Sequence, residues 1–190
     1  MYKLIQFEAD TEFFEKKSRF LGLSRKISSS EDFQAQFASL KQLHPKANHI
    51  TFAYRIKDTA TNNIKTRFSD DGEPSGTAGK PILAHLEGQD LINTVIFVIR
   101  YFGGVKLGTG GLVRAYSHSA GLTLEASGRC EYIDHKSFAF SLPYGKQRLL
   151  EYHLKNMSFE SVSIDYGETI DVEISCTEEL IGELKKNLGI

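Results

Sequence analysis

Five of the nine residues from Gly103 to Gly111 are glycine, and this stretch constrains the fold more than any other feature of the sequence. Ordering a glycine costs about 0.5–1 kcal/mol more than ordering an alanine in regular structure, so this composition needs a physical reason. Either positive φ angles or close backbone packing demand glycine here, or a ligand has to reach the backbone amides. The sequence leaves both interpretations of this glycine loop open.

The segments on either side of the glycine loop predict where it lies in the fold. Val95 to Arg100 is short, β-branched and apolar, which is typical of a strand buried on both faces, so we expect it at the centre of a sheet. Gly111 to Ser127 has helical spacing of its apolar residues. The loop therefore leads from a buried strand directly into the first turn of a helix.

Other patterns in the first part of the chain indicate mixed secondary structure. Alternating or β-rich residues predict strands over Lys16–Leu23 and His49–Ile56. Between them, a capping box, Ser28-x-x-Glu31, precedes apolar residues at helical spacing from Phe33 to His44, which predicts an amphipathic helix. A further helix is expected over Thr77–Leu86, with Pro81 in an early turn.

Charge and glycine content both change along the chain. The formal net charge is −1, but residues 1–130 hold 17 Lys and Arg against 13 Asp and Glu (+4), whereas residues 131–190 hold 6 against 11 (−5). We therefore expect an α+β protein with two domains, residues 1–130 and residues 136–190. In the second, strands over 137–142, 159–165 and 169–176 and helices over 145–157 and 178–187 give the order β-α-β-β-α, a ferredoxin-like split βαβ unit without its last strand.

Composition excludes several classes of protein. Two cysteines, Cys130 and Cys176, are too few for a disulfide scaffold and lack zinc-site spacing, so we expect a reducing, cytoplasmic location. The longest purely aliphatic and aromatic run, Val95 to Ile99, is five residues, so neither a signal peptide nor a membrane span is expected. A net charge of −1 also excludes a polybasic tail protein.

The glycine loop and its cations predict an anion-binding surface. No Asp or Glu occurs from Leu91 to Leu124, and a glycine-rich helix N-terminus presents unpaired N–H groups to phosphate. The pattern matches neither a P-loop nor a dinucleotide fingerprint, so no cofactor is expected. The predicted contact residues are Lys80, Arg100, Tyr101, Gly103, Gly104, Lys106, Gly108, Gly110, Gly111 and Arg114.

Two alternatives involve chemistry rather than binding. Asp70, Asp71 and Glu73 are hard ligands that suit Mg²⁺, although the turn-rich sequence around them favours a role in capping the following helix. His49 and His118 are isolated, and no nucleophile and base are paired in the sequence, so no catalytic residue is predicted. A phosphate- or nucleotide-binding enzyme of unknown reaction remains the alternative to a binding module.

At these motifs the sequence resembles the family of the bacterial YigZ proteins and the N-terminal part of the eukaryotic IMPACT proteins. The matching stretches are Lys16–Phe20, Ala53–Arg55, Phe68–Ile82 and Arg100–Ser117. The resemblance implies a first domain similar to the second domain of small-subunit ribosomal protein five and to domain IV of elongation factor G. It implies a ferredoxin-like second domain similar to domain V of that factor. Thr51 stands where the family often has cysteine, which excludes thiol chemistry there.

The resemblance also indicates a function in translation. Eukaryotic members regulate translation by competing for the activator of the amino-acid-starvation kinase, and nucleic-acid or ribosome binding is the usual suggestion for bacterial members. We therefore expect a non-enzymatic module that places the glycine loop against RNA or the ribosome. Three to five phosphate contacts give non-specific affinities no better than about 10⁻⁴–10⁻⁶ M, so duplex DNA should bind weakly or not at all. A protein-docking regulator of translation remains open.

Overall fold

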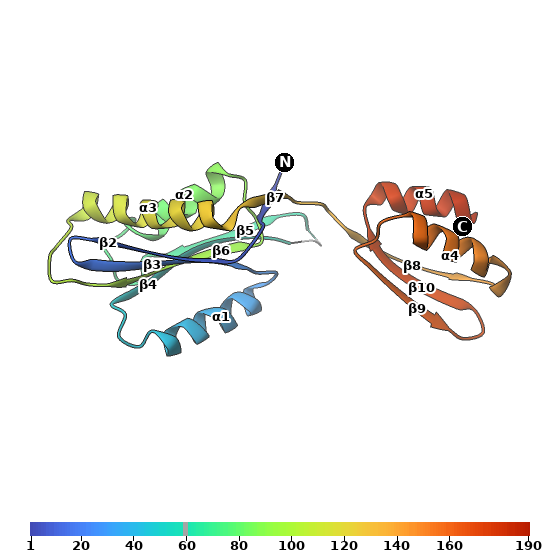
Figure 1. Cartoon of the computed structure of the whole chain (residues 1–190), viewed down its shortest axis with the longest axis horizontal. Helices are drawn as coiled ribbons and strands as arrows, with labels where there is room; N and C mark the ends of the chain where they lie inside the picture. Colours follow the sequence, from blue (N-terminus) through green and yellow to red (C-terminus); the bar gives the residue numbers. More distant parts are fainter. Residues whose placement is uncertain (59–60) are drawn as a thin grey trace. The chain divides into compact units, whose positions relative to one another are not determined.

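The chain folds into two compact units, Met1–Tyr132 and Ile133–Ile190. A computed structural model describes residues 1–58 and 61–190, and Figure 1 shows the elements of each unit. Both units combine helices with antiparallel sheets, so the expected α+β fold class is confirmed.

The first unit is built on a five-stranded antiparallel sheet in the order β2-β3-β6-β4-β5. Strand β6 (Thr94–Tyr101) is central, between β3 (Ser18–Lys26) and β4 (His49–Lys57), while β2 (Ala9–Glu15) and β5 (Ile64–Ser69) form the edges. All of β6 except its last residue is buried, so the prediction of a central strand is confirmed. The sequence did not predict either edge strand. For β5 the reason is that its residues are mostly exposed and leave no alternating pattern.

Helices cover both faces of this sheet (Figure 1). Helix α1 (Ser30–Leu43) packs Phe33 against Phe97 on one face, whereas α2 (Gly79–Gly88) and α3 (Thr109–Ser127) enclose a second apolar core on the other. The N-cap of α1 is Ser29 and not Ser28, because the hydroxyl of Ser29 accepts from the amide of Asp32, while the carboxylate of Asp32 accepts from the amide of Ser28.

The ends of the first unit pair with one another. Short strands β1 (Lys3–Ile5) and β7 (Arg129–Glu131) form a two-stranded antiparallel sheet. Each strand has only three residues, too few for a periodic pattern, and the sequence did not predict them. Their pairing ties the start of the chain to the segment that follows α3.

The second unit has the expected order β-α-β-β-α. Its elements are β8 (Lys136–Leu142), a 3₁₀ turn η1 (Tyr144–Lys146), α4 (Gln147–Asn156), β9 (Ser161–Tyr166), β10 (Ile170–Cys176) and α5 (Glu178–Leu188). Strand β10 lies between β8 and β9, and both pairings are antiparallel. Alternate residues of β10, such as Val172 and Ile174, pack with Leu150 of α4 and Leu184 of α5.

Candidate phosphate-binding site

Four of the five glycines in the glycine loop have a conformational or packing reason. Gly104 and Gly108 have φ values of +86° and +71°, which other residues rarely adopt. A Cβ at Gly103 would lie 1.9 Å from the carbonyl oxygen of Lys17, and one at Gly111 would lie 3.0 Å from the Cβ of Leu107. The structural interpretation of the glycine content therefore holds for these four positions.

Gly110 is the exception in the loop. A Cβ there would meet nothing closer than Nη1 of Arg114, at 3.9 Å, and its φ lies outside the left-handed region. It is the second residue of α3, where glycine costs about 1 kcal/mol relative to alanine. Neither packing nor φ therefore requires glycine at this position of the loop.

The N-terminus of α3 is uncapped by any side chain. Its N-cap is Gly108, and the first turn contains no acidic residue. The first amide bonded back to the cap is that of Leu112, which donates to the carbonyl of Gly108 at 2.9 Å. Helix geometry leaves the earlier amides, from Thr109 to Gly111, without intrahelical acceptors. These N–H groups and the helix dipole favour an anion at this end of the helix.

Exposed cations surround this helix end. Lys106 of the loop and Arg114 of α3 are exposed, and neither forms an ion pair with any residue of 1–58 or 61–190. Lys16 and Lys17 join them, because the backbone of Lys17 packs against Gly103 and Lys16 lines the same hollow as Arg114. We call Lys16, Lys17, Lys106 and Arg114 the basic rim.

The two lysines of the β2–β3 turn were not among the predicted contacts. Their φ values are 44° and 65°, so Lys16 and Lys17 form the tight turn of the hairpin between β2 and β3. The sequence contained the basic pair but gave no prediction of β2, so the turn and its neighbour across the sheet were not recognised. The pairing of Arg19 with Tyr101 places this turn beside the end of β6, where the glycine loop begins.

Arg100 does not belong to the basic rim. Its side chain is 6% exposed, with Nη1 2.6 Å from Oε1 of Glu73 and Nη2 3.3 Å from Oγ of Ser18. The guanidinium also lies over the rings of Phe20 and Phe102. The structure thus corrects the expectation of an exposed surface cation, because Arg100 is held in a buried ion pair at the end of β6, although its side chain still lines the pocket beside the glycine loop.

Two further predicted residues lie differently from the expectation. Tyr101 is half-buried, and its hydroxyl lies 2.8 Å from Nδ1 of His44 at the end of α1, whereas the next residue, Phe102, is 44% exposed. The aromatic ring exposed at the glycine loop is therefore Phe102. Lys80 is exposed on α2. It lines neither the hollow that Lys16 shares with Arg114 nor the pocket beside the glycine loop that is described below.

The three acidic residues that were considered as Mg²⁺ ligands have partners within the protein. Asp70 accepts backbone N–H bonds from Gly76, Ala78 and Gly79, and Asp71 accepts from the amide of Ile50 at 2.6 Å. Burial acts to raise the pKa of Asp70, but these amide bonds outweigh it and hold the pKa below its usual value. Asp70 therefore caps the start of α2, as the sequence favoured. No cluster of three or more metal-ligating side chains occurs among the described residues.

A pocket of about 410 Å³ opens beside the glycine loop, and we call it the loop pocket. The start of β4 contributes Asn48 and His49, the turn before α2 contributes Glu73 and Pro74, and the loop contributes Phe102 and Lys106. Gly108 and Thr109 at the start of α3 complete one wall. The loop pocket thus adjoins both the uncapped helix end and the buried ion pair.

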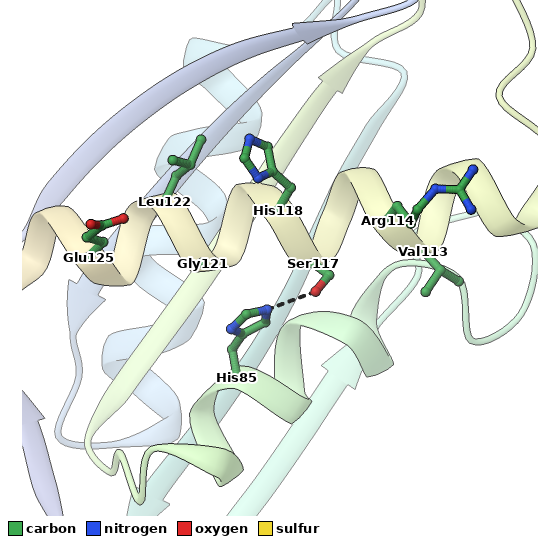
Figure 2. A pocket seen from close by; sticks show the side chains of 8 residues that line it. All are labelled: His85, Val113, Arg114, Ser117, His118, Gly121, Leu122 and Glu125. Atoms are coloured by element: carbon green, nitrogen blue, oxygen red, sulfur yellow. Dashed lines mark hydrogen bonds between the residues drawn. The ribbon is translucent and has the colours of Figure 1, made fainter.

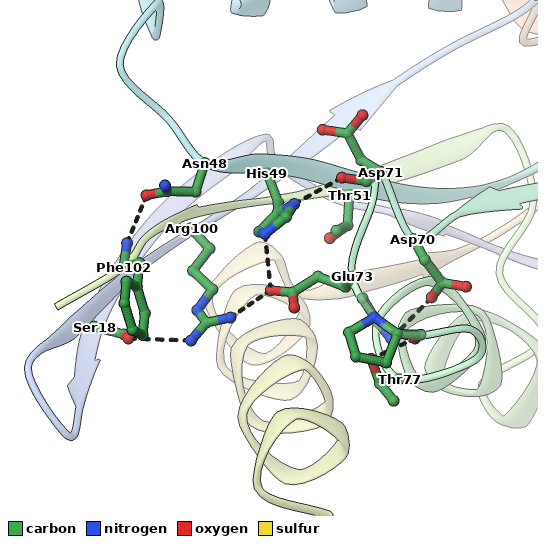
Figure 3. Close-up of polar contacts among 12 residues, drawn as sticks. Ser18, Asn48, His49, Thr51, Asp70, Asp71, Glu73, Thr77, Arg100 and Phe102 are labelled. Atoms are coloured by element: carbon green, nitrogen blue, oxygen red, sulfur yellow. Dashed lines mark hydrogen bonds and ion pairs between the residues drawn. The ribbon is translucent and has the colours of Figure 1, made fainter. Parts of the chain in front are cut away.

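Glu73 is the centre of a polar network at the base of this pocket (Figure 3). Its Oε1 accepts from Arg100 and, at 2.7 Å, from the hydroxyl of Tyr116, while Nε2 of His49 lies 3.8 Å away. Burial, and then the charge of Glu73, raise the pKa of Tyr116, so this hydroxyl remains a donor. Nδ1 of His49 lies 2.7 Å from the carbonyl oxygen of Asp71, which accepts a hydrogen bond from it.

Another groove, of about 580 Å³, runs between α2 and α3 (Figure 2). Nε2 of His85 lies 2.9 Å from Oγ of Ser117, and burial lowers the pKa of His85. Among the hydrogen bonds of the described residues, none joins an acid to this histidine, so the pair lacks the orienting group of a nucleophilic triad. None of the helices within residues 1–58 and 61–190 is both long and apolar enough to cross a bilayer.

Comparisons with known proteins connect this arrangement to one family. The family described as Impact N-terminal domain matches residues 16–124. An IMPACT family member of Haemophilus influenzae is 35% identical over 173 residues, which cover 91% of this chain and 84% of that protein. YvyE of Bacillus subtilis is 34% identical over 178 residues, covering 94% and 81%. The crystal structure of a hypothetical protein superposes with a TM-score of 0.73 at 28% identity, covering 98% of this chain and 90% of that one.

Proposed function

The chain belongs to the IMPACT family, and from that premise we propose that it is a non-enzymatic binding module that places the glycine loop against RNA phosphates in translation. The observation that carries this proposal is the uncapped N-terminus of α3 inside the basic rim. Exposed amides supply directed hydrogen bonds, and four exposed cations supply long-range attraction. Within the glycine loop, Gly110 is the glycine without a packing or φ requirement, and it lies at this helix end.

The number of cations limits the strength of this binding. Four contacts to single-stranded RNA give a slope of log K against log salt of about −3, and non-specific affinities of about 10⁻⁴–10⁻⁶ M. Tighter association therefore requires structured RNA or the ribosome, where several phosphates are held in fixed positions. Binding to plain duplex DNA should be weak for the same reason. Membership of the IMPACT family supports the proposal that this RNA binding acts in translation, in the cytoplasm.

Binding of ribosomes and structured RNA across a salt series tests the proposal. We expect Lys106→Ala to weaken binding and to reduce the salt slope by about one. Lys26→Ala is the matched control, because Lys26 pairs with Thr94 at the end of the sheet away from the loop, seven residues or about 23 Å along the strand from Tyr101. No binding at about 50 mM salt, or an equal effect of the two variants, contradicts the proposal.

The alternatives give different results in simple assays. Association with a partner protein that survives nuclease treatment and does not depend on the basic rim favours a protein-docking regulator. A thermal shift with nucleotides that requires Mg²⁺ favours an enzyme. In the structure the carboxylates of Asp70 and Asp71 accept hydrogen bonds from backbone amides, so the enzyme alternative would need other groups to hold Mg²⁺.

A further inference from the structure

Glu73 has one carboxylate oxygen without a partner. Its side chain is only 4% exposed, yet both of its hydrogen bonds go to Oε1, from Arg100 and Tyr116. Oε2 forms no bond with any residue in the described part of the chain, and Figure 3 shows it clear of the dashed contacts. Glu73 lines the loop pocket, and Oε2 is the carboxylate oxygen that its contacts within the described residues leave for a ligand there.

This oxygen can only accept a hydrogen bond, so it selects a ligand that carries an N–H or O–H donor. Buried polar atoms in native proteins are nearly always satisfied, and an open one in a pocket is a point of recognition. The neighbouring Arg100 balances the negative charge of Glu73, so the pair does not repel an anionic ligand as a free carboxylate would. The loop pocket therefore fits a ligand that has a donor at one end and an anion at the other.

Phe102 supplies a stacking surface on the same pocket. Its ring is 44% exposed, and the guanidinium carbon of Arg100 lies 5.4 Å from the ring centroid. Aromatic rings exposed beside a basic groove bind unstacked bases, because every nucleobase has a π-face. The pocket volume, about 410 Å³, lies in the range of small-ligand sites.

The anion-binding end of the pocket is the start of α3. Gly108 and Thr109 line the loop pocket together with Lys106, so the uncapped amides and a cation of the basic rim adjoin the space beside Phe102. Resting on the function proposed above, we infer that the loop pocket receives one unpaired RNA nucleotide. Its phosphate lies at the N-terminus of α3, its base stacks on Phe102, and an amino group of the base donates to Oε2 of Glu73.

The chemistry of Glu73 sets a preference among the four bases. Adenine, cytosine and guanine each have an exocyclic amino group that can donate to a carboxylate. Uracil has none, and its ring N–H is flanked by two carbonyl oxygens that a carboxylate repels. Paired bases are unavailable, so the ligand is single-stranded. We expect oligo(A) and oligo(C) to bind more tightly than oligo(U) of the same length.

Fluorescence anisotropy with labelled oligo(A), oligo(C) and oligo(U) at low salt tests this inference. We expect the wild-type protein to prefer oligo(A) and oligo(C) to oligo(U) about ten-fold, and Phe102→Ala to lose about ten-fold in affinity for oligo(A). Phe7→Ala is the matched control: Phe7 is 61% exposed and bonds to Ser127 at the other end of α3, about 27 Å along the helix from Thr109. It should leave binding unchanged.

Glu73→Gln adds a donor at the same place and should remove the discrimination against oligo(U). If that variant does not fold, the oligonucleotide series with wild type and Phe102→Ala still decides the question. Equal affinity for the three oligonucleotides and an unaffected Phe102→Ala variant overturn this inference. If Lys106→Ala still weakens binding in that case, the proposed function stands without it. Absence of binding to every RNA tested overturns both.

Discussion

Nη1 of Arg100 lies 2.6 Å from Oε1 of Glu73, and both side chains are more than nine-tenths buried. This ion pair joins the end of β6 to the turn before α2, and the hydroxyl of Tyr116 connects it to α3. Three elements around the loop pocket thus depend on one carboxylate oxygen. The ion pair also gives Arg100, the first residue of the Arg100–Ser117 motif, a structural role.

Arg100→Ala should therefore destabilise the protein strongly. Removing one member of a buried ion pair leaves the other charge uncompensated, which costs about 3–5 kcal/mol. Lys106→Ala, at an exposed position, should change the free energy of unfolding by no more than about 0.5 kcal/mol. Urea denaturation of the two variants and the wild type measures the difference. A variant without Arg100 that unfolds at the wild-type midpoint contradicts the structural role.

Two glycine variants separate packing from ligand approach. Gly103→Ala should cost about 1–3 kcal/mol, because its Cβ would lie 1.9 Å from the backbone of Lys17. Gly110→Ala should instead raise stability by up to about 1 kcal/mol, since it replaces glycine with the best helix former in open space.

The binding assay gives the second half of this comparison. If a phosphate approaches the amide of Gly110, Gly110→Ala should weaken RNA binding even though it stabilises the fold. Gly88→Ala is the control: Gly88 is the last residue of α2, and its Cβ would also meet nothing within 4 Å. Unchanged RNA affinity in Gly110→Ala shows that the phosphate does not approach this amide.

Asp70 should contribute to the pH dependence of stability. Its pKa is lower in the folded protein than in the unfolded chain, so the unfolded state binds the proton more readily. The contribution is then complete above the unfolded pKa of about 3.9 and is lost as pH falls through the folded pKa. Asp70→Asn should flatten the stability profile below about pH 5. Thermal unfolding of both proteins across this range measures it, and parallel profiles would contradict the capping role.

The first unit should fold and bind RNA without the second. Residues 1–132 contain both apolar cores of the five-stranded sheet, the β1–β7 pair and the whole basic rim. We expect a fragment of these residues to unfold cooperatively and to retain the RNA affinity of the full chain. Circular dichroism and the anisotropy assay check both points. A folded fragment with lost affinity would assign RNA contacts to residues 133–190.

Local patterns in the sequence were sufficient for the main elements of the fold. Val95 to Arg100 could be recognised as a buried central strand because its β-branched run is hydrophobic on both faces. The apolar spacing of α1, α3, α4 and α5 predicted helices within a few residues of their observed bounds. The glycine loop and the motifs around it also sufficed for the family, since these features lie within short stretches of chain.

The membership of the candidate site depended on contacts between distant segments. The sequence of a strand that is buried on both faces does not indicate whether a charged side chain at its end is buried. The burial of Arg100 is explained only by its ion pair with Glu73, which lies 27 residues earlier in the chain. Lys17 joins the glycine loop because β3 pairs with β6 and brings its turn against Gly103. The sequence predicted a loop that favours anions. The packing of β3, β6 and α3 selected which cations and which aromatic ring surround it, because side-chain direction is set by the neighbours across the sheet.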